Sequence, residues 1–350
     1  MSNKSESLRV GVMMGGPTGE HAVSVNSGIE VVKAVVELGH TPLPIFISQE
    51  ETWHLLEVDR LLQSKTSLDP DSKSSSTFST LGKKLSSFAE IANSDLDVVF
   101  IAMHGPYGED GKIQAMLELL RLPYTGSGVL TSALSMDKVQ FRRIMMAEHI
   151  LIPQSTTFTN ESIEEIMRTV KAEIGEPPFV IKPSDQGSSI GVSLVHTWND
   201  FSKAVTAARS VSETLLVDRY VKGRELTVGV LGTKQPIAMP VTEIIPEGEF
   251  FDYNAKYLST VTKELCPAEL DTTIAQEIQQ IAVQVFRIVG GAGFGRVDFI
   301  LDERNQAFVL EINTIPGLTK ASLLPKAAAA QGMTFAQLIQ AVLDDALLRA

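Results

Sequence analysis

An apolar run that stops at a cluster of glycines constrains the fold of this chain most strongly. Leu8–Met14 contains β-branched residues and leads into the glycine-rich loop 15–19, which predicts a buried strand followed by a tight turn. Apolar residues at helical spacing follow over Val23–Leu38, and further apolar strands are predicted at Thr41–Ile47 and Asp97–Ala102. Strand, helix and strand at this spacing indicate an α/β region with a parallel sheet and crossover helices.

After residue 130 the predicted elements include a larger share of strands. Strands are expected at Phe179–Lys182, Ile190–Val195, Leu215–Val221, Glu225–Leu231, Gly295–Leu301 and Ala307–Ile312, and helices at Ser132–Ile150, Ile274–Val289 and Phe335–Leu348. This part of the chain is therefore expected to have an α+β fold. A length of 350 residues suggests two or three domains.

Composition excludes several classes of protein. The 30 Lys and Arg residues against 42 Asp and Glu give a net charge of −12, which argues against nucleic acid as the main partner. No apolar run approaches the roughly 18 residues of a membrane span, and no signal peptide is recognised. The single Cys266 cannot form an internal disulfide, so we expect a reducing, cytoplasmic location.

One segment is unlike the rest of the chain in composition. Ten of the seventeen residues at 64–80 are Ser or Thr. Such a composition is typical of a mobile surface insertion without chemistry of its own.

Lys182 ends a predicted strand and is followed by small residues over 183–191. Gly and Ser leave backbone N–H groups uncovered, so this loop could approach phosphate oxygens while the lysine supplies a positive charge. The alternative is a plain hairpin with a surface lysine. The chain lacks the G-x-x-x-x-G-K-[ST] pattern, which excludes that type of phosphate loop.

Acidic and amide side chains recur at a spacing of two on two late strands. Arg296 and Asp298 share one face of their strand, and Glu311 and Asn313 share one face of theirs. If the strands are neighbours, three oxygen-bearing side chains converge, a set that suits Mg²⁺ completed by water and nucleotide phosphates. Val297, Phe299, Leu310 and Ile312 then face the core. The alternative is a solvated polar face.

Loops add further candidate groups. Residues 314–323 could offer N–H donors to a developing oxyanion, with Arg296 adding charge, or could be an ordinary turn. Glu20, in the loop after the first strand, could pair with an ammonium group or serve only the start of a helix. His104 begins a second glycine-rich loop, where a histidine is more often structural. The aromatic and charged segment 250–257 could be a lid or a surface loop.

Seven segments in this order resemble the D-alanine–D-alanine ligases of the ATP-grasp superfamily. They are GGPTGEHAVSVNSG (15–28), MHGPYGEDGKIQ (103–114), LPYTGSGVLTSALSMDK (122–138), KPSDQGSSIGVS (182–193), FFDYNAKYLS (250–259), GRVDFILD (295–302) and LEINTIPGLTKASLLPK (310–326). They cover nearly the whole chain. The resemblance implies that ATP phosphorylates the carboxylate of one D-alanine, and that the amino group of a second attacks the acyl-phosphate, for peptidoglycan precursor synthesis.

The resemblance also implies roles for residues at matching positions. For ATP these are the phosphate-binding Lys138 and Lys182, the adenine hinge Asp218, Arg219, Tyr220 and Val221, and the ribose-binding Glu225. Two Mg²⁺ (or Mn²⁺) ions would be held by Asp298, Glu311 and Asn313. Glu20, linked to Ser188 and Tyr257, would hold the first ammonium, Arg296 and Gly317 the tetrahedral intermediate, and Ser322 the second carboxylate. His104 and Lys256 would lie near substrate.

The implied architecture is an N-terminal parallel-sheet domain at 1–130 followed by a two-lobed ATP-grasp domain, with lobes at 131–220 and 221–350. The second lobe would carry the metal and oxyanion site, and the family suggests a homodimer acting on ATP and D-alanine. The hinge departs from the family in having Asp218-Arg219 where Glu-Lys is frequent. Tyr257 in the lid favours an amine acceptor over D-lactate, so D-alanyl-D-alanine is the preferred product. The alternative is a related ATP-grasp ligase with D-lactate or D-serine as acceptor. A regulator that has lost catalysis would lack some of these groups.

Overall fold

The computed structural model describes residues 7–63, 76–187, 190–246 and 262–350. The N-terminal sheet has the order β4-β3-β2-β1-β5, with β1 at Arg9–Gly15, β2 at Thr41–Ile47, β3 at Trp53–Leu56, β4 at Gly82–Lys84 and β5 at Val98–Ile101. β1 pairs in parallel with β2 and β5, as predicted, but β3 and β4 add antiparallel strands that the sequence reading missed. The predicted parallel sheet is therefore mixed.

Helix α1 (His21–Glu37) packs on β1 and β2, so the loop that precedes it lies at the carboxyl end of β1. Shorter helices of this region are α2 (Val58–Gln63), α3 (Ser76–Ser79), α4 (Ala89–Ala92) and α5 (Lys112–Leu119). Residues 64–75 of the predicted insertion lie outside the described residues. Its end does not fit a surface insertion, because Phe78 is fully buried and packs against Phe46.

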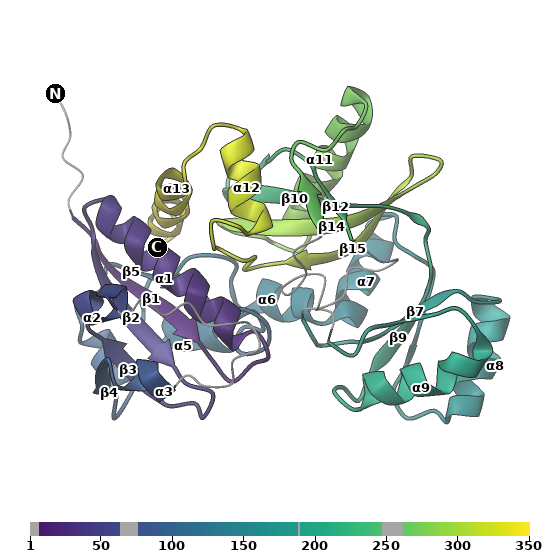
Figure 1. Ribbon diagram of the computed structural model, residues 1–350, viewed down its shortest axis with the longest axis horizontal. Coiled ribbons are helices and arrows are strands. Elements are labelled where there is room, and N and C mark those ends of the chain that lie inside the picture. The colour runs from purple at the N-terminus through teal and green to yellow at the C-terminus, as the bar shows by residue number, and fades with distance from the viewer. Residues whose placement is uncertain (1–6, 64–75, 188–189, 247–261) are drawn as a thin grey trace.

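A second sheet is antiparallel throughout and has the order β6-β9-β7-β8. Its strands are β6 (Ser155–Phe158), β7 (Phe179–Pro183), β8 (Ser193–Val195) and β9 (Leu215–Arg219). Helices α8 (Ile163–Glu173) and α9 (Trp198–Arg209) share an apolar core with it. This unit forms the separate lobe at the right of Figure 1.

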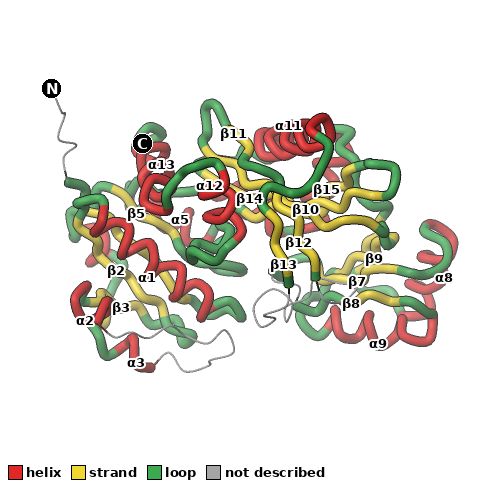
Figure 2. The backbone as a smooth tube through the Cα atoms, turned by 45° about the horizontal axis from the view of Figure 1, so that its top comes forward, coloured by secondary structure: helices red, strands yellow, loops and turns green. Residues whose placement is uncertain are grey.

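The third sheet carries the strands with the acidic residues. Its order is β13-β12-β10-β14-β15, from β10 (Gly223–Leu231), β12 (Thr242–Ile245), β13 (Lys263–Leu265), β14 (Phe294–Asp302) and β15 (Ala307–Asn313), and β11 (Ile237–Ala238) also pairs with β10. Helices α7 (Lys138–Ala147) and α11 (Thr272–Ile288) pack in its apolar core. Figure 2 shows the three sheets side by side, with the third between the other two.

The C-terminal helices return to the N-terminal sheet. Leu324 of α12 (Leu323–Ala330) and Leu338 of α13 (Phe335–Leu347) belong to the same buried apolar cluster as Val12 of β1. The end of the chain therefore ties the first sheet to the third.

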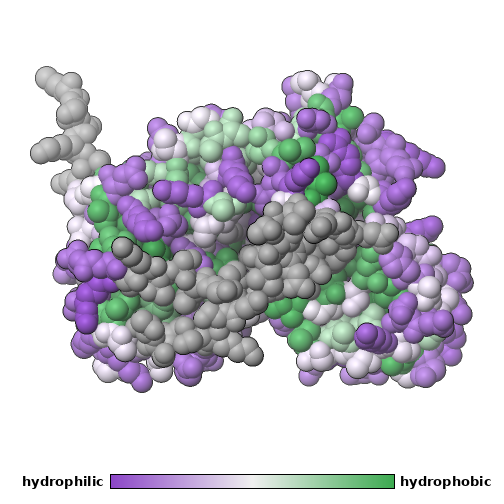
Figure 3. Space-filling model, in the orientation of Figure 1, coloured by the Kyte–Doolittle hydropathy of each residue, from purple (hydrophilic) through white to green (hydrophobic). Residues whose placement is uncertain are grey.

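Hydrophilic side chains cover the outer turn between β14 and β15 in Figure 3.

The helix predicted at Ser132–Ile150 is wrong, because Asp137 divides it. α6 spans Val129–Met136, and Asp137 then adopts an extended backbone with ψ 101° and caps α7 by accepting N–H bonds from Val139 and Gln140. The break gives Lys138 the first position of a new helix. Across the described part of the chain, we find no helix long and apolar enough to cross a membrane.

Candidate active site

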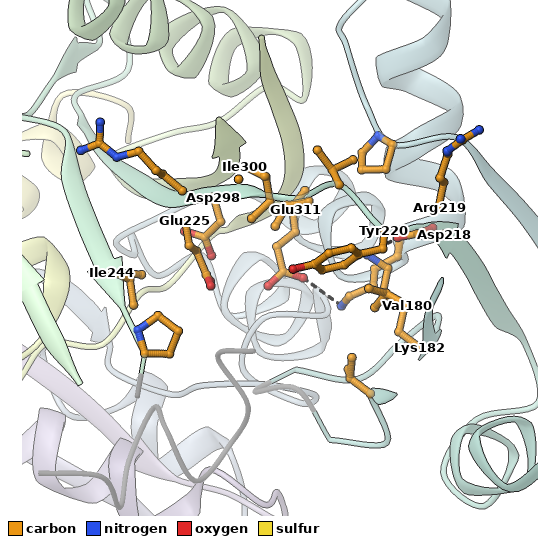
Figure 4. A pocket seen from close by; sticks show the side chains of 18 of the residues that line it. Val180, Lys182, Asp218, Arg219, Tyr220, Glu225, Ile244, Asp298, Ile300 and Glu311 are labelled. Atoms are coloured by element: carbon orange, nitrogen blue, oxygen red, sulfur yellow. Dashed lines mark ion pairs between the residues drawn. The ribbon is translucent and has the colours of Figure 1, made fainter. Parts of the chain in front are cut away.

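A cavity of about 310 Å³ lies where the second and third sheets face each other. The predicted nucleotide and metal residues that line it are Lys138, Lys182, Asp218, Arg219, Tyr220, Val221, Glu225, Asp298 and Glu311. Figure 4 shows Glu225, Asp298 and Glu311 coming from one side of the cavity, and Lys182 and Asp218 from the other. Residues far apart in sequence thus meet in one pocket.

The paired strands β14 and β15 bring the acidic residues together as the spacing predicted. Asp298 lies opposite Glu311 and Arg296 lies opposite Asn313 in the antiparallel register. The Asn313 amide donates to Oδ2 of Asp298 over 3.0 Å. Two carboxylates and an amide oxygen therefore converge on one face, a donor set that fits a hard divalent cation.

One core prediction on these strands is wrong. Val297, Phe299 and Ile312 are buried in the apolar core, but Leu310 lines the cavity. The register shifts between Asp298 and Phe299, so that residue 310 has no partner on β14. A bulge of this kind turns one side chain out of the strict alternation, and here it gives the cavity an apolar wall.

Asp298 is buried and held from three sides. Arg296 donates to both of its carboxylate oxygens through Nε and an Nη, each over 2.8 Å. The Thr227 hydroxyl on the neighbouring β10 donates to Oδ1 over 2.5 Å. This fork of bonds orients the carboxylate and the guanidinium together, so both groups are preorganised.

Lys138 reaches the cavity because the start of α7 is tied to the loop after β7. The Lys138 amide donates to the Ser184 carbonyl over 2.9 Å, and the Ser184 hydroxyl donates to the capping Asp137 over 2.8 Å. The Lys138 ammonium donates to the Gln186 carbonyl over 2.8 Å and lies 3.2 Å from Glu311. One positive group thus bridges the phosphate-type loop and the acidic strand.

Lys182 forms an ion pair over 2.8 Å with Asp218, and Asp218 also pairs over 2.7 Å with Arg142. All three side chains are buried. Burial lowers the pKa of Lys182, while Asp218 opposes that change. Burial also disfavours the charged form of Asp218, but Arg142 and Lys182 outweigh it and lower the pKa of Asp218. Arg142 is a residue that the sequence analysis missed.

The hinge at residues 218–221 includes the last two residues of β9 and lines the cavity. Arg219 is exposed and its side chain points away from the cavity in Figure 4. Tyr220 and Val221 also line the space, and Glu225 follows on β10. An outward-pointing side chain at this position makes Arg in place of Lys compatible with the site. The main-chain N–H groups of Arg219 and Tyr220 already donate to the Gln154 and Pro178 carbonyls, over 2.8 Å and 3.2 Å.

A second, smaller cavity of about 40 Å³ adjoins the first, and Lys138, Gly187 and Glu311 line both. Glu20 lines the smaller one, buried, and its side chain forms no cap bond to the helix that it precedes. A Cβ atom on Gly105 would lie 2.5 Å from Oε2 of Glu20, and one on Gly187 would lie 2.8 Å away. Glycine at both positions therefore makes room for this carboxylate.

His104 is buried between the N-terminal region and the loop after β15. Its Nδ1 lies 2.8 Å from the Ile315 carbonyl and its Nε2 lies 2.9 Å from the Ser27 hydroxyl. Ser27 in turn accepts an N–H bond from Leu318. Burial lowers the pKa of His104, so the ring is neutral, donates from Nδ1 to Ile315 and accepts from Ser27. His104 thus holds the loop and does not line either of the two cavities.

Glu109 is a second residue that the sequence analysis missed. It lines the smaller cavity, and its two oxygens accept N–H bonds from Gly105 over 2.7 Å and Ile315 over 2.9 Å. Burial and the charge of Glu20 raise the pKa of Glu109 to about 8. Its only sequence signal was its place inside the glycine-rich loop that starts at His104.

The raised pKa of Glu109 predicts a pH effect on stability. The folded protein keeps the Glu109 proton up to about pH 8, while the unfolded chain loses it near 4.5, so the free energy of unfolding falls as pH rises between these values. The loss is on the order of 5 kcal/mol at most. Urea unfolding at several pH values, without ligand, should show a shallower decline for Glu109→Gln. The exposed Glu148→Gln is the control, and parallel curves for wild type and Glu109→Gln would refute the effect.

Gly317 and Ser322 meet at the start of α12. A Cβ atom on Gly317 would lie 2.8 Å from the Ser322 hydroxyl, so the loop passes too close for a larger residue. Ser322 accepts the Thr319 N–H over 3.1 Å and contacts the Thr319 hydroxyl at 2.8 Å.

Three of the predicted site residues, Ser188, Lys256 and Tyr257, lie outside the described residues, as does the proposed lid at 250–257.

Comparisons with known proteins agree along the chain. A family model described as "D-ala D-ala ligase N-terminus" matches residues 9–127, and one described as "D-ala D-ala ligase C-terminus" matches residues 142–344. A protein of Bordetella avium (strain 197N) named D-alanine–D-alanine ligase is 38% identical over 339 residues, covering 97% of this chain and 94% of its own.

Two solved structures share the fold. The D-alanine–D-alanine ligase from Coxiella burnetii has a TM-score of 0.83 at 28% identity and covers 98% of this chain and 96% of its own. The VanG D-Ala:D-Ser ligase from Enterococcus faecalis also has a TM-score of 0.83 at 28% identity, with coverage of 97% and 100%. The likeness therefore includes ligases with two different acceptors.

Proposed function

The chain belongs to the D-alanine–D-alanine ligase family, and from this premise we propose how its two cavities carry the reaction. It has the ATP-grasp architecture of its structural relatives. The enzyme is an ATP-dependent ligase that joins two D-alanines for peptidoglycan precursor synthesis. The placement of each ligand, described next, is our proposal.

ATP occupies the larger cavity in this proposal. The hinge Asp218–Val221 contacts adenine, and Glu225 binds ribose. Lys138 and Lys182 hold the phosphates, and Ser188 is assigned to the same binding role. The support is that both lysines and the hinge line the same cavity.

Asp298, Glu311 and Asn313 would hold the divalent cations, two Mg²⁺ or Mn²⁺ ions, on the phosphate side. Within the described residues no cluster of three His, Cys, Asp or Glu side chains could hold a metal by itself. Such an incomplete set suits Mg²⁺, which keeps water and phosphate oxygens among its ligands. The cations would neutralise the triphosphate while Lys138 and Lys182 orient it.

The first D-alanine fits the smaller cavity, with its ammonium on Glu20 and its carboxylate toward the phosphates. Its carboxylate oxygen bonds to the γ-phosphorus and ADP leaves. The amino group of the second D-alanine then attacks the acyl carbon, loses a proton and displaces phosphate. Ser188, Lys256 and Tyr257 would complete the binding site of this substrate. His104 would hold the loop after β15 in place through Ile315.

The tetrahedral intermediate of the second step carries a negative oxygen. We assign its stabilisation to the Arg296 guanidinium and the Gly317 backbone N–H, and we place the second carboxylate on Ser322. Arg296 lies opposite Asn313, which lines the smaller cavity.

One observation carries the proposal: Lys138, Gly187 and Glu311 line both cavities. A phosphate bound in the larger cavity and a carboxylate bound in the smaller one therefore lie side by side. Holding the two reactants together in this way removes most of the entropic barrier to their reaction.

The test is release of phosphate from ATP with Mg²⁺ and D-alanine, L-alanine, D-serine and D-lactate, offered singly and in pairs. D-Alanine alone should suffice near pH 8, and the dipeptide should be the product. The VanG relative favours D-serine as the second candidate acceptor. A requirement for D-serine or D-lactate would overturn the dipeptide assignment, and no phosphate release with any pair would overturn the ligase proposal.

We also propose a homodimer in the cytoplasm and division of the chain at residues 130 and 220. The return of α12 and α13 to the N-terminal sheet predicts that the first domain needs residues 323–347 to fold. Sedimentation of the purified enzyme gives its oligomeric state, and a monomer at micromolar concentration would refute the dimer.

A further inference from the structure

Arg142 does not line the nucleotide cavity but contacts residues that do. It is on α7, one turn after Lys138, and it is 4% exposed. One guanidinium nitrogen donates to the Pro153 carbonyl over 3.0 Å and the other to Oδ2 of Asp218 over 2.7 Å. Pro153 and Asp218 both line the cavity, while Arg142 does not.

A single carboxylate oxygen is shared by two cations. Oδ2 of Asp218 lies 2.7 Å from Arg142 and 2.8 Å from the Lys182 ammonium. Asp218 is 3% exposed and Lys182 is 7% exposed, so solvent screens these charges weakly. The cluster of three groups carries one net positive charge.

This surplus positive charge matters for Lys182, the cation of the cluster that lines the cavity. Without Arg142, Lys182 and Asp218 would form a neutral pair, and the carboxylate would offset much of the attraction of the ammonium for an approaching phosphate. The other cavity lysine, Lys138, also has a carboxylate beside it, since its ammonium lies 3.2 Å from Glu311. Arg142 cancels the charge of Asp218 and so leaves the attraction of Lys182 available to an anion.

We propose that Arg142 is a positioning residue for nucleotide binding, which neutralises Asp218 so that Lys182 can engage a phosphate. The inference rests on the proposed use of this cavity for ATP. It adds a role for a residue that touches neither ATP nor amino acid in the proposed arrangement.

The test is calorimetric binding of ADP with Mg²⁺, and of adenosine, to Arg142→Met. ADP affinity should fall about tenfold or more, whereas adenosine, which has no phosphate, should bind as in wild type. The KM for ATP should rise, with kcat at saturating ATP within about threefold. Equal ADP affinity in wild type and variant would overturn the proposal, and so would an equal loss for adenosine.

A double variant separates charge from structure. In Arg142→Met with Asp218→Asn, the repelling carboxylate is gone as well, so ADP affinity should recover to within about threefold of the Asp218→Asn variant. A merely structural role for Arg142 predicts no such recovery. Continued loss of ADP affinity in the double variant would therefore overturn the proposal.

Arg143→Met is the matched control, because Arg143 is adjacent on α7 and exposed. It removes the same charge from the same helix and should leave ADP affinity unchanged. If Arg142→Met does not fold, Arg142→Lys decides: the charge is kept, so ADP affinity should be retained, and a tenfold loss would overturn the proposal. Failure of the wild-type enzyme to bind ADP would instead contradict the proposed function.

Discussion

Replacement of Glu311 by glutamine is expected to stop metal-dependent turnover. Glu311 lines both cavities and lies opposite Asp298, and in the proposed arrangement it would hold a cation between nucleotide and amino acid. The amide keeps the shape but removes the charge. Loss of a metal-held phosphate is worth several kcal/mol, which corresponds to a fall in kcat of about 10³-fold or more.

The measurement is steady-state phosphate release over a range of Mg²⁺ concentrations. Glu303→Gln is the matched control, since Glu303 lies in the turn of the same β14–β15 hairpin and is exposed. It should behave as wild type. Normal turnover of Glu311→Gln at low Mg²⁺ would count against the assigned metal site.

Replacement of Arg296 by alanine should slow the chemical step and leave ATP affinity nearly unchanged. Its guanidinium is preorganised by two bonds to Asp298 and would stabilise the negative oxygen of the tetrahedral intermediate. Loss of one such donor costs roughly 3–4 kcal/mol, or about 10²–10³-fold in kcat. Single-turnover phosphate release with saturating D-alanine measures this step.

The substitution also leaves Asp298 without its paired charge, so stability must be measured beside activity. Arg296→Lys retains a positive charge and should fall between wild type and Arg296→Ala in kcat. Arg304→Ala, in the exposed hairpin turn, is the control. If folded Arg296→Ala turns over at a near-normal rate, Arg296 has no part in the mechanism.

Sequence spacing predicted the acidic face because strand geometry is local. Alternate residues on a strand share a face, so Asp298, Glu311 and Asn313 could be grouped as soon as their two strands were paired. The same rule failed at Leu310, since a bulge depends on how two strands meet. It could not reveal Asp137 as a break within a continuous helical pattern, where capping decides.

Family resemblance supplied roles for residues within recognisable motifs, and the structure groups many of them around two adjoining cavities. It supplied no role for Arg142 or for Glu109. Their meaning comes from contacts that the motifs do not contain.

What the sequence determined by itself is the succession of β1, α1 and β2 at the start of the chain, the polar face of β14 and β15, and the family. These follow from short-range periodicity and from motifs of adjacent residues. Only the tertiary structure decided that Arg142 pairs with Asp218, 76 positions away, and that Glu109 holds Ile315, 206 positions away. Such pairings arise from the packing of separate sheets, and no local pattern of side chains encodes which distant charges will be buried together.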